Sequence, residues 1–271
     1  DRSPSRGLGD VYKRQTMNIK EIKKEALLAR ICATRQIMGE DAAQAAAESI
    51  NQLLKEKEEI NILFAAAPSQ NEFLAALQKY ALPWNRIHAL HMDEYIGLQA
   101  DAPQRFGNYL KEHIFAALPF KSIHYLYIEG ASPENICTHY EEVLQKHPID
   151  IVFMGIGENG HIAFNDPHVA LFDDPQQVKV VLLDEVCRTQ QVHDGCFSSL
   201  EKVPQQAVTI TIPVMMKATR IFCIVPGKPK ANAVKETLYG PVSTTCPASI
   251  LRTHPHATLY CDRDSASLLS I

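Results

Sequence analysis

The stretch that decides the fold runs from residue 149 to residue 167 and reads IDIVFMGIGENGHIAFNDP. Its first six residues, Ile149–Met154, are apolar except for Asp150, which is typical of a β-strand buried on both faces. A polar loop containing glycines, residues 155–166, follows this strand directly. Because a strand buried on both faces needs helices on both sides of its sheet, this stretch predicts the centre of a layered α/β fold.

Apolar runs on either side of this stretch repeat the pattern. Further strands are predicted at Ile60–Ala67, Ile87–Met92, Ser122–Ile128, Val178–Leu183, Ala207–Pro213, Arg220–Gly227 and Ala257–Cys261. Residues 71–80, 106–118, 133–147 and 229–238 have the spacing of helices. Strands that alternate with helices indicate βαβ units, and therefore an α/β fold of three layers with a mostly parallel central sheet.

The first part of the chain differs from this alternation. Residues 1–16, DRSPSRGLGDVYKRQT, are basic and carry Gly, Ser and Pro, and we interpret them as an extension outside the fold. From Met17 to Glu59 the apolar residues are spaced as in helices, which predicts two helices with a break at Met38-Gly39. Because no linker or repeat divides the remainder, residues 17–271 are predicted to form a single domain.

Composition and charge restrict the classes of function. Of the 271 residues, 46% are apolar and 21% are charged, ordinary globular values that exclude a mainly disordered or coiled-coil chain. The formal net charge of −4 gives no bulk attraction to nucleic acid or to an anionic membrane. No apolar run reaches the ~18 residues of a membrane span. The seven cysteines are scattered without metal-ligand spacing, which favours buried thiols in a reducing cytoplasm and no metal site.

Polar clusters follow three predicted strands, at residues 67–70, 93–95 and 155–166. Ligand sites of parallel sheets collect at the carboxyl ends of strands, so these clusters form the candidate functional site. Residues 155–160 also match the GxGxxG pattern of dinucleotide-binding proteins. The segment up to Pro167 is too short for the helix that would bind a pyrophosphate, so we interpret the glycines as turn positions beside a small ligand.

Two pairs of polar residues in these clusters have both a structural and a catalytic interpretation. His161 and Asp166 lie in one loop, where the carboxylate can orient the imidazole for acid–base catalysis or simply cap a turn. Asp93 and Glu94 are neighbours at a strand end, so either they form a solvated loop or one of them faces a pocket.

A serine and two lysines have a similar ambiguity. Ser69 precedes a predicted helix, where its hydroxyl can cap the N-terminus or help to bind an anion. Lys228 and Lys230 follow Pro226-Gly227 and are either surface charges or the cationic side of such an anion site.

Four segments together resemble the glucosamine-6-phosphate deaminase family. They are HMDEYIGL (91–98), GIGENGHIAFNDP (155–167), VPGKPKANAV (225–234) and TCPASILRTHP (245–255). The resemblance extends over nearly all of residues 17–271. It implies a Rossmann-like fold, similar to those of ribose-5-phosphate isomerase and 6-phosphogluconolactonase. It also implies conversion of glucosamine 6-phosphate to fructose 6-phosphate and ammonia without a metal or an organic cofactor.

The resemblance implies catalytic roles for four residues. Asp93 matches the family's proton-transferring base, His161 matches the histidine that opens the sugar ring, and Asn159 and Asp166 match the partners of that histidine. The chemistry suits these residue types, because an imidazole can accept and donate the protons that move when a cyclic sugar opens. A carboxylate can take the C2 proton and return it to C1.

The resemblance also implies a substrate and phosphate site. Lys230 matches the phosphate-binding lysine, and His193 occupies the position of a phosphate-binding arginine, with Arg188 nearby as a substitute. Ser69 and Gly160 complete the implied set.

Two loops depart from the family pattern. Residues 65–70 read AAAPSQ where the family has a loop rich in glycine and in Thr or Ser, and Pro68 lacks a backbone N–H. In the other loop, Asn159 stands where many members have Asp, and Asp166 stands where most have Glu.

Other functions stay open at this point. A sugar phosphate lactonase of the same fold would not need a base such as Asp93, so HMDEY favours the deaminase. A non-catalytic sugar-phosphate-sensing module would resemble effector domains of transcription regulators, but neither terminus offers a basic helix-turn-helix segment. The hexosamine (gluco or galacto) and the formation of a homo-oligomer are left undecided by the sequence.

Overall fold

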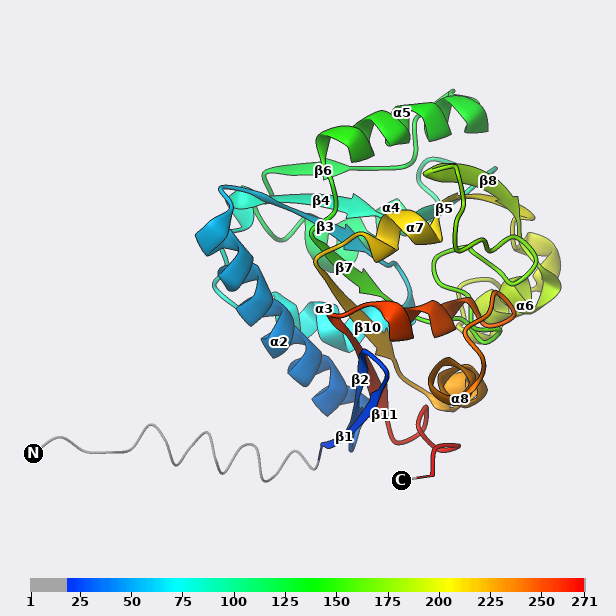
Figure 1. Cartoon of the computed structure of the whole chain (residues 1–271). Helices are drawn as coiled ribbons and strands as arrows, with labels where there is room; N and C mark the ends of the chain where they lie inside the picture. The colour runs from blue at the N-terminus through cyan, green and yellow to red at the C-terminus, as the bar shows by residue number, and fades with distance from the viewer. Residues whose placement is uncertain (1–18, 271) are drawn as a thin grey trace, which may run out of the picture.

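A mostly parallel sheet forms the centre of the protein, which this computed structural model describes over residues 19–270 (Figure 1). The main-sheet strands are β1 Lys20–Lys24, β2 Leu27–Cys32, β3 Ile60–Phe64, β4 Ile87–His91, β6 Ser122–His124, β7 Ile151–Met154, β10 Arg220–Val225 and β11 Ala257–Asp262. Their order is β1-β2-β11-β10-β7-β3-β4-β6. In this sheet β1 and β2 pair antiparallel and the other neighbours pair parallel, which confirms the predicted mostly parallel sheet.

Helices cover both faces of this sheet. They are α2 Arg35–Glu56, α3 Asn71–Leu77, α4 Phe106–Leu110, α5 Pro133–Lys146, α6 Glu185–His193, α7 Ile212–Met216 and α8 Ala231–Tyr239. Short 3-10 helices occur at Pro68–Gln70, Trp84–Arg86, Leu200–Lys202, Lys228–Lys230 and Pro247–Thr253, and a π-helical turn at Lys111–Phe115 continues α4. Among the described residues, no helix combines the length and the apolar character that a membrane span needs.

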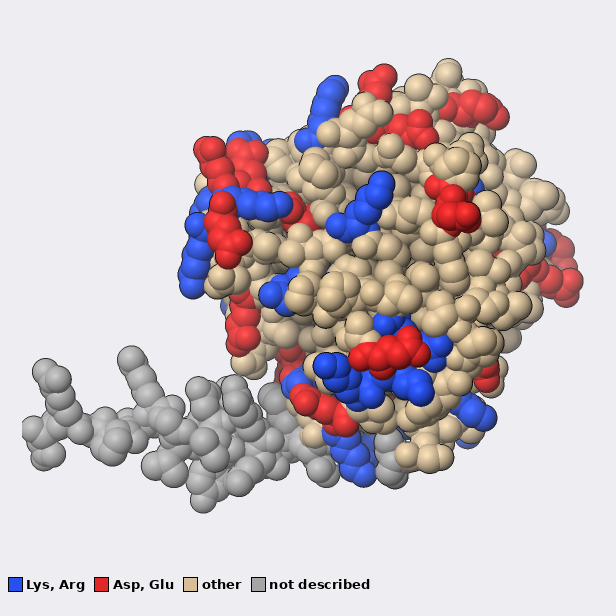
Figure 2. Space-filling model, in the orientation of Figure 1, with Lys and Arg blue, Asp and Glu red and all other residues tan. Residues whose placement is uncertain are grey.

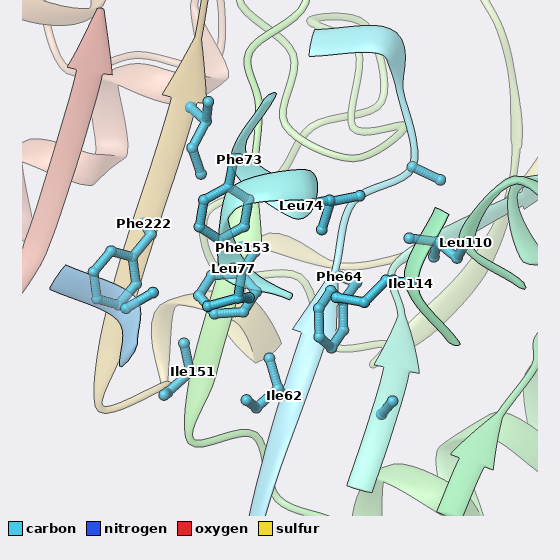
Figure 3. Packing of buried hydrophobic residues seen from close by; sticks show 14 of the residues in the cluster. Ile62, Phe64, Phe73, Leu74, Leu77, Leu110, Ile114, Ile151, Phe153 and Phe222 are labelled. Carbon is cyan, nitrogen blue, oxygen red and sulfur yellow. The ribbon is translucent and has the colours of Figure 1, made fainter. Parts of the chain in front are cut away.

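Strand β7, residues 151–154, shows why this apolar segment becomes the middle of the sheet. Its side chains alternate between two hydrophobic clusters, with Phe153 on the side of α2 and α3 and Val152 on the side of α5, α7 and α8. Phe153 packs edge-to-face against Phe64 of β3 and Phe73 of α3, with ring centroids 5.2 and 4.8 Å apart (Figure 3). Burial on both faces is therefore the observed state of this strand.

The prediction of two N-terminal helices is wrong for the described part of that segment. The chain forms the β1–β2 hairpin, turns through Glu25 at a φ of 52°, and only then enters the single helix α2. In β2 the residues Leu27, Ala29 and Ile31 are buried in alternation, which is the period of a strand. The predicted extension, residues 1–16, lies outside the described residues.

Gly39, where a break was predicted, lies inside α2. A Cβ built at this position would come within 2.7 Å of the Cβ of Glu72, which belongs to α3. The glycine therefore allows close packing of α2 against α3 and does not interrupt the helix.

Three strands form a second sheet, which the sequence did not indicate. Strands β5 Asp93–Tyr95, β9 Gln206–Ile210 and β8 Val178–Leu182 pair antiparallel, in the order β5-β9-β8. The predicted run at 178–183 is a strand, and so is the first part of the run at 207–213, whereas Ile212 and Pro213 begin α7. Both strands belong to this sheet and not to the parallel one. Because β5 follows β4 after one residue, the small sheet continues from the carboxyl end of the main sheet.

Candidate active site

A pocket lies where strands β3, β4 and β7 end. The loops after these strands form its wall, together with parts of α4 and α6 and the 3-10 helix Lys228–Lys230 that precedes α8. The lining residues are Ala65, Ala66, Ala67, Ser69, Gln70, Met92, Asp93, Phe106, Gly155, Ile156, Gly157, His161, Ala163, Phe164, Gln190, Gln191 and Lys230. The three polar clusters predicted at strand ends therefore contribute to one cavity.

Asp93 is the acidic residue on the wall of this pocket. It begins β5, pairs with Thr209 of β9, and has only 7% of its surface exposed. Burial, and then the nearby charge of Glu94, raise the pKa of Asp93 well above its usual range. A carboxyl group in this state binds a proton more strongly than a solvated one, so it can both accept and return a proton near neutral pH.

Glu94 points away from the pocket and supports the fold. Its carboxylate accepts hydrogen bonds from the backbone N–H groups of Tyr95, Phe106 and Gly107, at 2.9, 3.1 and 3.0 Å. Two of these donors begin α4, so Glu94 fixes the first turn of that helix. The structure confirms that only one of the two adjacent acids faces the pocket.

His91 holds the backbone of Asp93 in place, a contact that sequence reasoning missed. Its Nε2 accepts a hydrogen bond from the N–H of Leu126 at 2.9 Å. The proton is therefore on Nδ1, which lies 3.0 Å from the carbonyl oxygen of Asp93 and donates to it. Burial lowers the pKa of His91 to about 4, so the ring stays neutral.

His161 lies between two oxygen acceptors on one side of its ring. Its Nδ1 is 2.7 Å from Oδ1 of Asn159 and 2.9 Å from Oδ1 of Asp166. With a proton on Nδ1, the other ring nitrogen is left as an acceptor, and the ring lines the pocket. This arrangement orients a general base, so Asn159 and Asp166 stand beside the histidine where the sequence predicted them.

Asp166 is fully buried and stays ionised because of its partners. Burial alone would raise its pKa, but the hydrogen bond and charge of His161 together with the amide of Asn159 and the N–H of Asp184 lower it below the usual value. Asp184 is a second residue that sequence reasoning missed. It accepts from Nδ2 of Asn159 at 3.0 Å and from the N–H of Cys187 at 2.6 Å, so it links this network to the start of α6.

Glycines shape the loop around the histidine. A Cβ at Gly157 would lie 2.1 Å from the ring of His161, so this position must lack a side chain for the ring to occupy its site. Gly160 has a φ of 84°, and a Cβ there would lie 2.6 Å from Sγ of Cys246. Gly160, predicted as a substrate contact, lies against Cys246 and not on the pocket wall, because the turn and that close approach determine its position.

Of the predicted phosphate ligands, Ser69 and Lys230 line the pocket. Ser69 belongs to the 3-10 helix Pro68–Gln70, and its side chain does not cap α3. Lys230 has only 6% of its surface exposed, and burial lowers its pKa. Within residues 19–270, Lys230 is the only lysine or arginine on the pocket wall, whereas Lys228 is exposed.

Arg188 and His193 lie outside the pocket, which corrects the prediction for both. The Arg188 guanidinium donates to the carbonyl oxygens of Leu200 and Val203, at 2.7 and 3.0 Å. The side chain of His193 is 58% exposed, and its Nδ1 is 3.5 Å from a carboxylate oxygen of Glu158. Both residues belong to α6, but the side chains of this helix that line the cavity are those of Gln190 and Gln191.

Glutamines occupy this part of the wall. Gln190 and Gln191 of α6 and Gln70 of the first loop are buried and line the pocket. Gln70 donates to the carbonyl oxygen of Ile224 at 3.2 Å, and its own Oε1 is buried without a partner among the described residues. Their neutral side chains gave the sequence analysis no signal, because nothing in their local pattern marks them as ligands.

Three residues beside the pocket, His161, Asp166 and Cys187, offer metal-ligand atoms close to one another. Burial, and then the carboxylates of Asp166, Asp184 and Asp93, raise the pKa of the Cys187 thiol well above its usual value. A protonated thiol is a poor ligand, so these residues fit a metal badly.

Comparison with known proteins gives the family. The family of glucosamine-6-phosphate isomerases and 6-phosphogluconolactonases matches residues 33–260. The chain belongs to this family. The glucosamine-6-phosphate deaminase of Listeria monocytogenes serotype 4a (strain HCC23) is 39% identical over 212 residues, 78% of this chain and 88% of that protein. That of Bacillus thuringiensis (strain Al Hakam) is 35% identical over 231 residues, 85% and 86% of the two chains.

Solved structures of the glucosamine-6-phosphate isomerase/6-phosphogluconolactonase family confirm the fold. A monomeric glucosamine-6-phosphate deaminase matches with a TM-score of 0.79 and 30% identity, over 89% of this chain and 99% of that one. The 6-phosphogluconolactonase of Thermotoga maritima matches with a TM-score of 0.71 and 20% identity, over 87% and 99%. The predicted α/β fold and its likeness to 6-phosphogluconolactonase are therefore confirmed.

Proposed function

We propose that this protein is a glucosamine-6-phosphate deaminase, which converts its substrate and one water into fructose 6-phosphate and ammonia. The observation that carries the proposal is the meeting of Asp93, His161 and Lys230 on the wall of one pocket. A carboxylate, an oriented imidazole and a buried cation are the groups that this reaction needs. The relatives of that name at 35–39% identity support the same reaction.

The first step opens the sugar ring. In the proposed reaction His161 accepts the proton of the C1 hydroxyl on its free nitrogen and gives a proton to the ring oxygen, which releases the open-chain aldehyde. Asp166 and Asn159 hold the opposite side of the imidazole and stabilise the charge that it carries between these transfers.

The second step moves a proton between neighbouring carbons. The carboxylate of Asp93 takes the C2 proton and leaves an enolamine, and it then returns the proton to C1 to give the imine at C2. Water adds to that carbon and ammonia leaves, so one water is consumed for each ammonia released. Lys230 binds the phosphate group and places C2 near Asp93.

The experiment is incubation with glucosamine 6-phosphate, followed by separate assays of ammonia and of ketose phosphate. We expect both products in equal amounts, and neither from the Asp93→Asn variant. Galactosamine 6-phosphate, tested in parallel, identifies the preferred hexosamine. Hydrolysis of 6-phosphogluconolactone, together with no release of ammonia from glucosamine 6-phosphate, would contradict the proposal in favour of a lactonase. Binding of the sugar phosphate without turnover would contradict it in favour of a sensing module.

A further inference from the structure

Three histidines that are distant in the sequence meet at the edge of the main sheet. His88 belongs to β4, His124 ends β6, and His147 directly follows α5. The ring of His147 lies 4.4 Å from that of His88 and 4.5 Å from that of His124, measured between centroids. One nitrogen from each ring lies within 4.8 Å of the other two. Figure 1 shows the three elements together, with α5 beside β6 and β4.

The register of the sheet creates this cluster. Asn61 of β3, His88 of β4 and Ser122 of β6 are direct partners in neighbouring parallel strands, so they form a polar row across the sheet. His124 lies two residues beyond Ser122, so it shares the face of that row. The end of α5 brings His147 to the same place, where its Nδ1 lies 3.1 Å from Oδ1 of Asn61.

Outer partners fix the orientation of two of these rings. A carboxylate oxygen of Glu59 lies 2.7 Å from Nε2 of His88, and Asn61 occupies the corresponding position for His147. Each partner accepts a hydrogen bond from the N–H of one ring nitrogen, so the lone pair is on the other nitrogen. An acceptor behind each imidazole is the usual arrangement around histidines that bind a metal.

The Ser122 hydroxyl connects two of the rings, because its oxygen lies 2.6 Å from Nδ1 of His88 and 2.7 Å from Nε2 of His124. With the proton of His88 on Nε2, this hydroxyl donates to Nδ1 of His88 and accepts from Nε2 of His124, so the lone pair of His124 is on Nδ1. Within the described residues, no hydrogen bond engages Nδ1 of His124 or Nε2 of His147.

We propose that His88, His124 and His147 bind one divalent transition-metal ion, of the class of zinc, cobalt and nickel. Three imidazoles are a ligand set that these ions prefer, and the Ser122 hydroxyl or a water completes the four positions. Tetrahedral zinc needs nitrogens roughly 3.3 Å apart, from bonds of about 2.0–2.1 Å, so small side-chain rotations close the site. The ion ties the edge strand β6 and the end of α5 to β4.

The proposed ion has a structural role and takes no part in the chemistry of the pocket. His88 lies near the amino end of β4, whereas Asp93 follows its carboxyl end. Metal binding and deaminase activity can therefore be measured independently of each other.

The test uses tag-free protein stripped with EDTA and titrated with Co²⁺, whose tetrahedral complexes absorb in the visible region. We expect one ion per chain, displacement of Co²⁺ by Zn²⁺, and a rise in Tm with bound metal that a chelator reverses. His124→Gln and His147→Gln should each weaken binding more than Glu59→Gln, which removes an outer partner and should cost about 10–100-fold.

His139→Gln is the matched control, because His139 is an exposed histidine of α5 outside the cluster. It should bind the ion like the wild type. Failure of the folded wild type to bind Co²⁺ or Zn²⁺ would overturn the proposal, as would unchanged binding by His147→Gln. If His124→Gln does not fold, His147→Gln decides, since that residue lies beyond the last turn of α5.

Discussion

Two adjacent carboxylates, Asp93 and Glu94, are both buried but differ in their hydrogen-bond partners. Asp93 faces the pocket, and burial and the neighbouring acid raise its pKa together. Burial also raises the pKa of Glu94, but three backbone N–H donors and the charge of Arg105 oppose that effect. One acid is therefore poised to exchange a proton with a ligand, and the other is bound to the start of a helix.

Asp93→Asn should abolish deamination and should also change how stability depends on pH. In the wild type the folded-state pKa of Asp93 lies above the unfolded value, so folding favours the protonated form. This contribution is present at low pH and is lost as the pH rises from the unfolded toward the folded pKa. The asparagine variant does not titrate, so its Tm relative to the wild type should increase with pH from 4 upward. A Tm difference that is constant over pH 4–8 would contradict the assigned pKa direction.

His161→Gln should reduce turnover of the cyclic sugar far more than turnover of an open-chain analogue. Glutamine keeps a hydrogen-bonding side chain of similar length but cannot exchange protons near neutral pH, so ring opening is the step that should suffer. The measurement is kcat/KM for both compounds. Equal losses would indicate that His161 supports the loop and does not catalyse ring opening.

Lys230→Ala should weaken the apparent affinity for glucosamine 6-phosphate by about 10–100-fold, because hydrogen bonds to charged groups contribute about 1.5–3 kcal/mol. Its effect on glucosamine, which lacks the phosphate, should be much smaller. Lys228→Ala is the matched control, since that lysine is exposed two residues away, and it should behave like the wild type. His193→Gln should also leave KM unchanged. Wild-type protein that turns over both sugars equally well would show that the pocket has no phosphate site.

Sequence motifs predicted the site residues that are proposed to exchange protons with the substrate or to bind its phosphate. Asp93, His161 and Lys230 could be predicted because their types and positions match a known pattern, and the structure brings them to one pocket. His91 and Asp184 could not, because their contacts depend on the backbone N–H of Leu126, two residues after β6, and on the start of α6, which no local spacing reveals.

At the scale of elements, the contact of α2 with α3 depends on the absence of one side chain. Gly39→Ala should destabilise the protein by about 1–3 kcal/mol, because the added Cβ overlaps Glu72 across the helix interface. Helix propensity alone predicts the opposite sign, since alanine favours helix by about 1 kcal/mol over glycine. Urea unfolding of this variant, with Gln44→Ala as an exposed control in α2, shows whether steric overlap or helix propensity determines the sign of the stability change. A more stable Gly39→Ala variant would contradict the close packing.

The buried parallel strands were predictable because continuous apolar runs of this length fit few other structures. The β1–β2 hairpin was not, since Ile19, Ile22 and Ala26 happen to satisfy a helical spacing while the alternation in β2 is only six residues long. The short strand β5 was read as part of a polar loop, because its pairing with β9 is a long-range contact.

At the scale of the whole molecule, two layers of helices cover the faces of the sheet, and the candidate active site lies at the carboxyl ends of its strands. On the face shown in Figure 2, basic and acidic side chains lie interspersed and are not gathered by sign. Among the described residues, the positive charge that a phosphate needs is supplied on the pocket wall by Lys230.

Deaminase activity should persist in EDTA, because the proposed reaction uses only side chains. The proposed histidine-bound ion lies at the other end of β4, so its removal should lower Tm and leave kcat and KM unchanged at temperatures well below unfolding. The measurement is the rate of ammonia release before and after chelation. Loss of activity that a single divalent ion restores would contradict a metal-free reaction.

The pairing of Asp93 with Thr209 places a constraint on chain length as well as on residue type. Side chains along a strand alternate between faces, so removing or adding one residue between β4 and β5 would turn Glu94 toward the pocket and Asp93 away from it. The glutamate would then reach the substrate with an extra methylene, and α4 would lose the carboxylate that fixes its first turn. Inserting or deleting one residue in this segment should therefore be harmful even at positions that tolerate a substitution.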